Sequence, residues 1–229
     1  MLQAAGGMIV WPAEYLSGLR KLCDRYSTLL IADEVLTGFG RTGRMFACEH
    51  AGVSPDIICL SKGLTAGYLP MGATATTENV YEAFLSQDRN KTFFHGHSYT
   101  ANPLGCAVAL ASLKLFRTER TLERVARLER QLRNRLERLR EFKHVGDVRV
   151  IGAVGIVELV QDKRTRSAGG YLDRVGPLLA EEFLRRNLLL RPLGNVVYFM
   201  PPYAITETQA DWALDEIADV LASWTWPQS

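Results

Sequence analysis

The chain has 229 residues, of which 47% are hydrophobic and 23% are charged, and its formal net charge is +2. This length suits one large domain or one and a half small ones, and the near-neutral charge gives no reason to expect an acidic partner. The four cysteines, Cys23, Cys48, Cys59 and Cys106, lie far apart without metal-binding spacing. We expect them to be reduced packing residues, although spacing alone does not decide against a disulfide. With no apolar leader and no apolar run of about 20 residues, the protein is predicted to be soluble and cytoplasmic.

A helix followed by a buried strand opens the chain. Pro12 stands where the first turn of a helix tolerates proline, and four apolar residues follow it at helical spacing: Leu16, Leu19, Cys23 and Tyr26. Residues 29–35 form a short apolar run that reads as a buried strand and contains Asp33 and Glu34 near its end. A helix leading into such a strand predicts a parallel α/β sheet.

A second strand carries a lysine into a turn. Residues 56–60 read as another short buried strand, and Ser61, Lys62 and Gly63 follow it directly. Residues 73–77 are expected to form a third strand of small residues, and residues 80–86 a short surface helix.

Two helices are expected next. Asn102 and Pro103 supply an N-cap and a first-turn proline for a helix whose alanine-rich, apolar surface predicts burial on more than one side. Residues 117–143 carry ten Lys or Arg and five Glu, and their apolar residues keep steps of three and four, which predicts an amphipathic helix. A nucleic-acid site would need the basic residues on one face, with base-reading side chains, so we favour a solvated helix face.

The pattern changes near residue 146. Strand-like segments over residues 148–160 precede a turn at 167–170 and a helix with Leu172, Val175, Leu179 and Phe183. Residues 188–191 and 196–200 predict short strands or a hairpin around Gly194 and Asn195, and residues 206–209 form a capping box for the last helix. We therefore predict a large domain over residues 1–145 and a small α+β domain over residues 146–229.

Asp33 and Lys62 suggest chemistry, because each follows or ends a predicted buried strand. The carboxyl ends of parallel strands share one edge of a sheet, so an acid and a lysine placed there can face one cleft. A lysine amine that bonds an aldehyde, with a carboxylate paired to a pyridine nitrogen, is what pyridoxal phosphate chemistry needs. A lone lysine is ordinarily a surface charge and a lone aspartate a cap or salt-bridge acid, so the prediction depends on the pair.

The motifs around these residues resemble a known family. Residues 31–35 (IADEV), 37–43 (TGFGRTG) and 61–64 (SKGL) are similar to the class III, or ω-type, pyridoxal phosphate aminotransferases. The resemblance implies a fold type I transferase of the α/β class, with a parallel-type sheet in a partial large domain. It also implies that pyridoxal 5′-phosphate is the cofactor, that Lys62 is the catalytic residue, and that Asp33 binds the cofactor.

Residues 95–99 (HGHSY) have two interpretations. His-x-His occurs in metal sites, but two histidines without a third ligand are a weak signal, and we predict no metal. The family resemblance implies that this segment crosses a homodimer interface. It places His97 and Ser98 at the cofactor phosphate of the neighbouring subunit, and Gly96 near the substrate.

Arg191 is the candidate for binding a substrate carboxylate, because a guanidinium fork pairs with such a group bidentately. Without the resemblance, an arginine capping a strand would be the preferred interpretation. The sequence around Arg191, together with residues 198–203 (YFMPPY), resembles the branch of the family that acts in biotin synthesis. That branch implies amino transfer from S-adenosylmethionine to 8-amino-7-oxononanoate, giving 7,8-diaminononanoate.

The resemblance covers essentially the whole chain, while the chain corresponds to about the second half of such an enzyme. No Gly-Ser-type phosphate turn precedes Asp33, and we expect such groups to come from the first half. The chain alone is therefore predicted to have little or no transaminase activity. Two alternatives stay open: another ω-aminotransferase with a different amino donor, or a non-catalytic fragment that needs a companion chain.

Overall fold

The computed structural model describes residues 2–168 and 174–226, and these divide by packing into two compact units. The first unit comprises Trp11–Gly40 and Arg44–Thr121. The second comprises Leu2–Val10, Arg41–Gly43 and the chain from Leu122 onward. Residues 122–145 thus pack with the second unit, while the predicted domain boundary between residues 145 and 146 stays a prediction.

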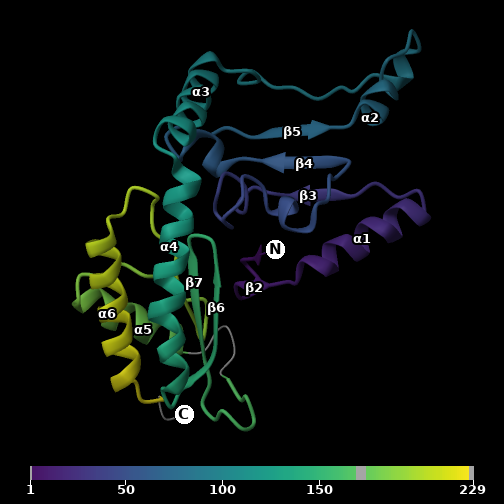
Figure 1. Cartoon of the computed structure of the whole chain (residues 1–229). Helices are drawn as coiled ribbons and strands as arrows, with labels where there is room; N and C mark the ends of the chain where they lie inside the picture. The colour runs from purple at the N-terminus through teal and green to yellow at the C-terminus, as the bar shows by residue number, and fades with distance from the viewer. Residues whose placement is uncertain (1, 169–173, 227–229) are drawn as a thin grey trace. The chain divides into compact units, whose positions relative to one another are not determined.

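The first unit contains a three-stranded sheet in the order β3-β4-β5, which Figure 1 shows in blue. β4 runs parallel to β3 and antiparallel to β5, so the sheet is mixed. The predicted helix after Pro12, the strands near residues 31, 57 and 73, and the short helix near residue 80 are all present. The elements of this unit are α1 (Ala13–Arg25), β3 (Ile31–Asp33), β4 (Ile57–Leu60), β5 (Ala73–Thr76), α2 (Glu78–Glu82) and α3 (Pro103–Thr118).

Two predictions about burial in this unit are wrong. β3 is not a buried strand, since Ile31 is 60% exposed and, among the described residues, the strand lies at an edge of the sheet beside β4. α3 buries one face, through Gly105, Ala109 and Ser112, and not more than one. Both patterns are apolar enough for two-sided burial, but among the described residues nothing covers the second side.

Small apolar clusters hold the first unit together. One consists of Leu16, Leu30 and Cys48, and another of Phe39, Leu64 and Ala109. Beside the first cluster, the Asp56 carboxylate accepts hydrogen bonds from the Leu30 N–H and from Arg20, both at 2.7 Å. These two donors, the backbone one first, lower the pKa of Asp56.

The second unit packs helices on a second, antiparallel sheet with the order β6-β7-β8. Figure 1 shows α4 and α6 side by side, and ion pairs from Arg135 to Asp211 and Asp215 join these helices. A two-stranded hairpin, β1 with β2, also belongs to this unit. Its elements are β1 (Leu2–Gln3), β2 (Ile9–Val10), α4 (Thr121–Leu136), β6 (Val145–Ile151), β7 (Val154–Leu159), α5 (Val175–Arg185), β8 (Val196–Phe199) and α6 (Glu207–Ser223).

The amphipathic pattern of residues 117–143 is confirmed by burial. α4 ends at Leu136 and a short 3-10 helix continues to Glu141, and the apolar stripe lies in the core of the unit. The core also receives the apolar faces of α5 and α6 and the inner residues of β6, β7 and β8. The buried members of the stripe are Val125, Leu128, Leu132, Leu136 and Leu139.

The predicted strand over residues 188–191 is wrong. That segment has no strand hydrogen bonding, and β8 pairs with β7. Of the alternative hairpin, the turn is present, since Leu193 forms an antiparallel bridge to Val196 across Gly194 and Asn195. β8 pairs with β7 because that strand offers a full edge, which allows a longer ladder of backbone hydrogen bonds. Of the predicted helix near residue 175, Leu172 lies outside the described residues, as does part of the predicted turn at 167–170.

Local capping signals are confirmed. The Thr206 hydroxyl accepts a hydrogen bond from the Gln209 N–H at 3.2 Å, and the Gln209 side chain accepts one from the Thr206 N–H at 3.0 Å. The Asn102 side chain caps α3 through the Leu104 N–H at 2.9 Å. In the part of the chain that the structure describes, no helix combines the length and the apolarity that a membrane crossing requires.

Candidate active site

Lys62 follows the end of β4 and begins a short 3-10 helix, Lys62–Thr65. Its φ angle is +37°, in the left-handed region that side-chain-bearing residues seldom adopt. The turn is held by the Ser61 hydroxyl, which donates to the Met71 carbonyl at 2.7 Å, and by the Leu64 N–H, which donates to the Ser61 carbonyl at 2.8 Å. Backbone strain of this kind clusters at functional sites and persists only where neighbouring contacts enforce it.

A pocket of about 350 Å³ opens beside Lys62. The Thr65 hydroxyl at its wall donates to the Leu69 carbonyl at 2.6 Å, so this hydroxyl and that of Ser61 are already engaged. The Lys62 amine, by contrast, is exposed and forms no hydrogen bond or ion pair with any described residue. The pocket is lined by Ser61, Lys62, Thr65, Gly67, Leu69, Pro70 and Met71.

Gly63, directly after the lysine, packs closely against Phe39. A Cβ added at Gly63 would lie 2.8 Å from the Phe39 Cβ, so the ring of Phe39 packs where a larger residue could not fit. The Ser112 hydroxyl of α3 donates to the Gly63 carbonyl at 3.4 Å. The glycine after the lysine is therefore required by close packing against the loop that follows β3.

Asp33 ends β3 directly opposite Cys59 of the parallel strand β4, and Lys62 comes three residues after Cys59. The carboxylate is exposed and accepts a hydrogen bond from the Val35 N–H at 2.9 Å. Among the described residues, Asp33 and Lys62 form no ion pair. The two side chains thus belong to the carboxyl ends of neighbouring parallel strands, the edge where open α/β sheets bind ligands.

Glu34 is a structural carboxylate, for which the sequence suggested no chemical role. Only 2% of the residue is exposed, and its oxygens accept hydrogen bonds from the Thr37 hydroxyl, the Ala47 N–H at 3.0 Å and the Cys48 N–H at 2.8 Å. Burial, with help from Glu34, raises the pKa of the Cys48 thiol to about 12. Because adjacent residues on an extended chain point to opposite sides, Asp33 stays exposed while Glu34 anchors the loop.

The segment with Gly96, His97 and Ser98 lies between α2 and α3 and is exposed throughout. It is ordered locally: the His97 N–H donates to the Thr100 hydroxyl at 3.0 Å, and the Tyr99 N–H donates to His97 Nδ1 at 3.1 Å. None of the residues lining the Lys62 pocket comes from this segment. The described residues also contain no group of three potential metal ligands. The roles expected for Gly96, His97 and Ser98 stay predictions.

Arg191 belongs to the second unit, in the segment between α5 and β8. It is exposed, and its guanidinium makes no hydrogen bond or ion pair with a described residue. A free guanidinium suits a carboxylate ligand, and the proposed substrate role stays a prediction.

Arg41 is a half-buried cation that sequence reasoning did not single out. In the second unit, its guanidinium donates to the Pro201 carbonyl at 2.9 Å and lies 4.5 Å from the centre of the Tyr203 ring. Burial lowers the pKa of Arg41 and raises that of Tyr203. The signal was present in the TGFGRTG stretch, but an arginine in a glycine-rich loop reads as exposed until its partners, 160 residues away, are known.

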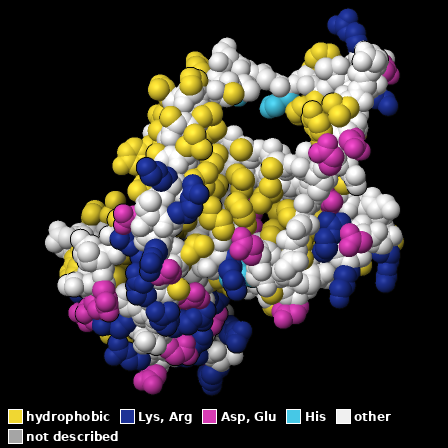
Figure 2. Space-filling view, turned by 45° about the horizontal axis from the view of Figure 1, so that its top comes forward, with side chains coloured by type: hydrophobic (Ala, Val, Ile, Leu, Met, Phe, Trp, Pro, Cys, Tyr) yellow, Lys and Arg dark blue, Asp and Glu magenta, His cyan; other side chains and the backbone are white. Residues whose placement is uncertain are grey.

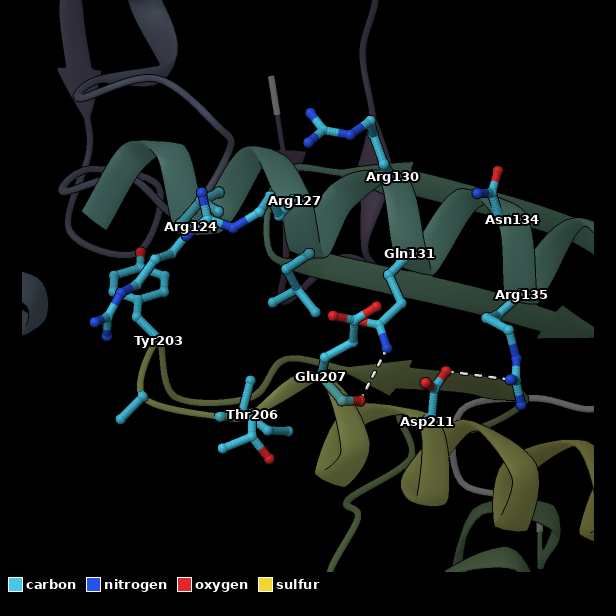
Figure 3. A pocket seen from close by; sticks show the side chains of 14 residues that line it. Arg124, Arg127, Arg130, Gln131, Asn134, Arg135, Tyr203, Thr206, Glu207 and Asp211 are labelled. Atoms are coloured by element: carbon cyan, nitrogen blue, oxygen red, sulfur yellow. Dashed lines mark hydrogen bonds and ion pairs between the residues drawn. The ribbon is translucent and has the colours of Figure 1, made fainter. Parts of the chain in front are cut away.

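A groove of about 700 Å³ between α4 and the start of α6 also went unnoticed (Figure 3). Arginines of α4 line one wall, and Tyr203, Thr206, Glu207 and Asp211 line the other. Asp211 pairs with Arg135 at 3.1 Å, and the Gln131 amide donates to the Glu207 carbonyl at 3.0 Å. None of the predicted site residues lines this groove.

Comparison with known proteins decides the family. A family model described as aminotransferase class III matches residues 1–221. The chain belongs to the class III aminotransferases. Adenosylmethionine-8-amino-7-oxononanoate aminotransferase from Geobacter sulfurreducens is 52% identical over 216 residues, which cover 94% of this chain and 48% of that protein. The enzyme of the same name from Aquifex aeolicus is 48% identical, over 94% of this chain and 48% of that protein. The chain spans about half the length of the curated relatives it matches.

Solved structures confirm the fold type I, α/β class. The adenosylmethionine-8-amino-7-oxononanoate aminotransferase of Methanocaldococcus jannaschii is similar with a TM-score of 0.90 and 40% identity, over 95% of this chain and 51% of that one. An amine transaminase from an uncultivated Pseudomonas species, solved in a PLP-bound form, has a TM-score of 0.91 and 40% identity over 96% and 50% of the two chains. The family and this neighbour indicate pyridoxal phosphate as the cofactor of the class III aminotransferases.

Proposed function

We propose that this chain carries the lysine-bearing half of an aminotransferase that moves an amino group from S-adenosylmethionine to 8-amino-7-oxononanoate. The observation that carries the proposal is Lys62, with its left-handed backbone and unpaired amine, beside a pocket at the end of β4. The names of the relatives, at 40–52% identity, support the biotin-pathway substrates. Another amino donor within the same family is the nearest alternative.

The residues at this site fit pyridoxal phosphate. The pocket presents one free amine at Lys62, and Asp33 supplies a carboxylate from the neighbouring strand end. When bound, the cofactor supplies an electron sink that makes a proton on the amine-bearing carbon of the substrate acidic. Asp33 would hold a proton on the pyridine nitrogen, and Lys62 Nζ would move the proton at the substrate carbon. Arg191 would bind the distal carboxylate of the acceptor substrate.

His97, Ser98 and Gly96 would act in a homodimer. Their segment is exposed, and it contributes nothing to the lining of the Lys62 pocket of its own chain. Both facts suit a loop that serves the cofactor phosphate of a second subunit, where a hydroxyl and free backbone N–H groups are good donors.

The test is an absorbance spectrum of the purified chain with pyridoxal phosphate, before and after borohydride, beside the Lys62→Ala variant. We expect a visible band and borohydride-stable incorporation that disappear completely in Lys62→Ala, while Lys91→Ala, an exposed lysine elsewhere in the same unit, keeps both. Incorporation that survives Lys62→Ala would contradict the assignment. Amino donors are then compared on the chain completed with a segment for the uncovered half, and no response to S-adenosylmethionine would remove that donor.

A second candidate is a fragment that is inactive without a companion chain. The observation that favours it is the exposed apolar surface of the first unit, which includes Ile31 and much of α3. Under this proposal the 229-residue chain has little or no transaminase activity alone. Clear turnover by the purified chain would exclude it.

A further inference from the structure

Two residues of the first unit that bear large side chains have left-handed backbone conformation close to the candidate site. The φ angle of Lys62 is +37°, and that of Phe39, in the loop after β3, is +56°. Such angles are rare for residues with a large side chain, because Cβ approaches the following carbonyl oxygen. They persist only where the surrounding structure enforces them, so the neighbours of both residues must hold them.

Phe39 is buried in a unit whose other aromatic side chains are largely exposed. Figure 2 shows hydrophobic side chains gathered on the surface of this unit, over the part where α3 lies. Phe39, by contrast, is only 3% exposed and packs with Leu64 and Ala109. Its ring meets that of Phe46 edge to face, with the ring centroids 5.7 Å apart and the planes at 70°. The ring of Phe39 therefore has a fixed place in this apolar cluster, which includes part of the turn that begins at Lys62.

The loop that carries Phe39 has little freedom to move. Glu34, at its start, is buried and accepts hydrogen bonds from the Ala47 and Cys48 N–H groups at 3.0 and 2.8 Å. The Gly38 N–H donates to the Glu34 carbonyl at 3.0 Å, and a Cβ added at Gly38 would lie 2.8 Å from that oxygen. The two ends of the loop are thus tied together, which limits where Phe39 can lie.

Phe39 packs against the backbone of Gly63, the residue directly after Lys62. A Cβ added at Gly63 would lie 2.8 Å from the Phe39 Cβ and 3.0 Å from its ring carbon Cδ2. The φ of Gly63 is not in the left-handed region, so this contact, and not the backbone conformation, requires the glycine. The Gly63 carbonyl accepts hydrogen bonds from the Ser112 hydroxyl at 3.4 Å and the Ala66 N–H at 3.2 Å. The backbone next to Lys62 is therefore held both by packing and by hydrogen bonds.

We propose that Phe39 is a positioning residue for Lys62. Its packing against Gly63 keeps the Lys62 backbone left-handed and so fixes the direction in which the lysine side chain leaves the turn. This inference rests on the proposed bonding of pyridoxal phosphate to Lys62, and it adds the residue that orients the amine for it. Phe39 acts through Gly63, since it is not among the residues that line the Lys62 pocket. A reactive group that is already oriented loses less freedom when it bonds its partner, which favours the bonded state.

The first test measures the Lys62 backbone without any cofactor. The chain is labelled with carbon-13 at lysine only, and the Lys62 Cα and Cβ signals are identified by nuclear magnetic resonance as those missing from Lys62→Arg. These chemical shifts depend on φ and ψ. We expect Phe39→Leu to move both signals toward the values of ordinary helical or extended backbone, because the smaller side chain no longer fixes Gly63. The matched control is Phe46→Leu, which removes a ring from the same cluster but none of the atoms nearest Gly63, and it should leave the signals unchanged.

The second test measures bonding of the cofactor. Pyridoxal phosphate is titrated into each variant, and borohydride-stable incorporation at Lys62 is followed by peptide mass mapping. Phe39→Leu should raise the concentration needed for half-maximal incorporation at least about tenfold, whereas Phe46→Leu should stay within about twofold of the wild type. Gly63→Ala disturbs the same contact from the side of the turn and should act as Phe39→Leu does in both tests.

Circular dichroism shows which variants are folded, and Gly63→Ala decides the outcome if Phe39→Leu is not. The proposal is overturned if the folded variant keeps the wild-type Lys62 signals, or if Phe46→Leu moves them equally. It is also overturned if the signals move while incorporation stays as in the wild type. A wild-type chain without incorporation at Lys62 would reject the proposed function, whereas the carbon signals would still decide whether Phe39 holds the Lys62 backbone.

Discussion

The two units of the chain differ in how they are held together. The second has a large apolar core cluster, in which Leu132, Leu179 and Phe183 are completely buried between helices and sheet. The first has small separate clusters around Leu16 and Phe39. Of the large hydrophobic residues that are exposed in the described part of the chain, seventeen of twenty belong to the first unit.

The large folding core and the candidate cofactor-binding residues therefore lie in different units. Lys62 and Asp33, the candidates for cofactor binding, lie in the unit with the smaller cores, while the second unit has the packing of a self-sufficient domain. We expect the second unit to unfold cooperatively on its own and the first to be less stable. Three of the four tryptophans, Trp212, Trp224 and Trp226, lie in the second unit, so tryptophan fluorescence reports mainly on that transition.

The largest effect is expected from Phe183→Ala, which removes a completely buried ring from the core of the second unit. Loss of the buried apolar surface and the cavity left behind should lower the free energy of unfolding by about 3–5 kcal/mol. Urea denaturation followed by tryptophan fluorescence measures the loss in the second unit, and native-state amide hydrogen exchange measures the stability of the first unit for its variants. Leu110→Ala in the first unit, where the side chain is 68% exposed, is the control and should change stability by less than about 0.5 kcal/mol. Equal effects would contradict the difference between the units.

Gly152→Ala tests the tight turn of the second unit. An added Cβ would lie 2.3 Å from the Gly43 backbone nitrogen, at a residue whose φ is +52°. Because backbone must move, we expect a loss of about 3 kcal/mol in the same denaturation experiment. Gly52→Ala in the first unit has a similar φ of +60° and open space around it, so only conformational strain of about 1–2 kcal/mol should remain. A Gly52→Ala variant as damaging as Gly152→Ala would show that φ, and not packing, decides.

Glu34→Ala should loosen the loop that Glu34 anchors in the first unit. It leaves the Ala47 and Cys48 N–H groups without their acceptor, which should cost about 2–3 kcal/mol locally. The pKa of about 12 keeps the Cys48 thiol protonated near pH 8, so alkylation is slow in the wild type and should speed up in the variant. The exposed neighbour Glu49→Ala is the control. Unchanged alkylation and amide exchange in Glu34→Ala would contradict the anchoring role.

The raised pKa of the Cys48 thiol predicts that the stability of the protein depends on pH in the alkaline range. Its folded pKa is raised above the unfolded value, so its contribution to stability is present below about pH 9 and is lost as the pH rises toward about 12. Cys48→Ala should flatten this part of the stability curve, while replacement of the partly exposed Cys23 should not.

The smallest effect is expected from Thr206→Ala, which removes the cap of α6. Loss of the hydrogen bond to the Gln209 N–H should lower the stability of the second unit by about 1 kcal/mol. Thr208→Ala, in the first turn of the same helix, keeps the cap and should have almost no effect. If both substitutions cost the same, helix propensity explains the loss better than capping does.

Much of the candidate site could be predicted because its signals are local. The strand that ends at Asp33 and the strand before Lys62 appear where the apolar runs placed them, and they are parallel neighbours. What the sequence did not reveal was which groups Glu34 anchors or that Arg41 is half-buried, since each depends on partners distant along the chain. Glu34 bonds residues 13 and 14 positions away, and Arg41 bonds a carbonyl 160 positions away.

The sequence by itself determined the helix caps at Asn102 and Thr206, the buried stripe of α4 and the placement of Lys62 after β4. These features depend on residue spacing and on hydrogen bonds between near neighbours, which few alternative structures satisfy. Only the tertiary structure decided that β8 pairs with β7, that α4 packs with the second unit, and that β3 and the outer face of α3 stay exposed. An apolar pattern states what a segment can bury, but whether it is buried depends on which other segments are present to cover it.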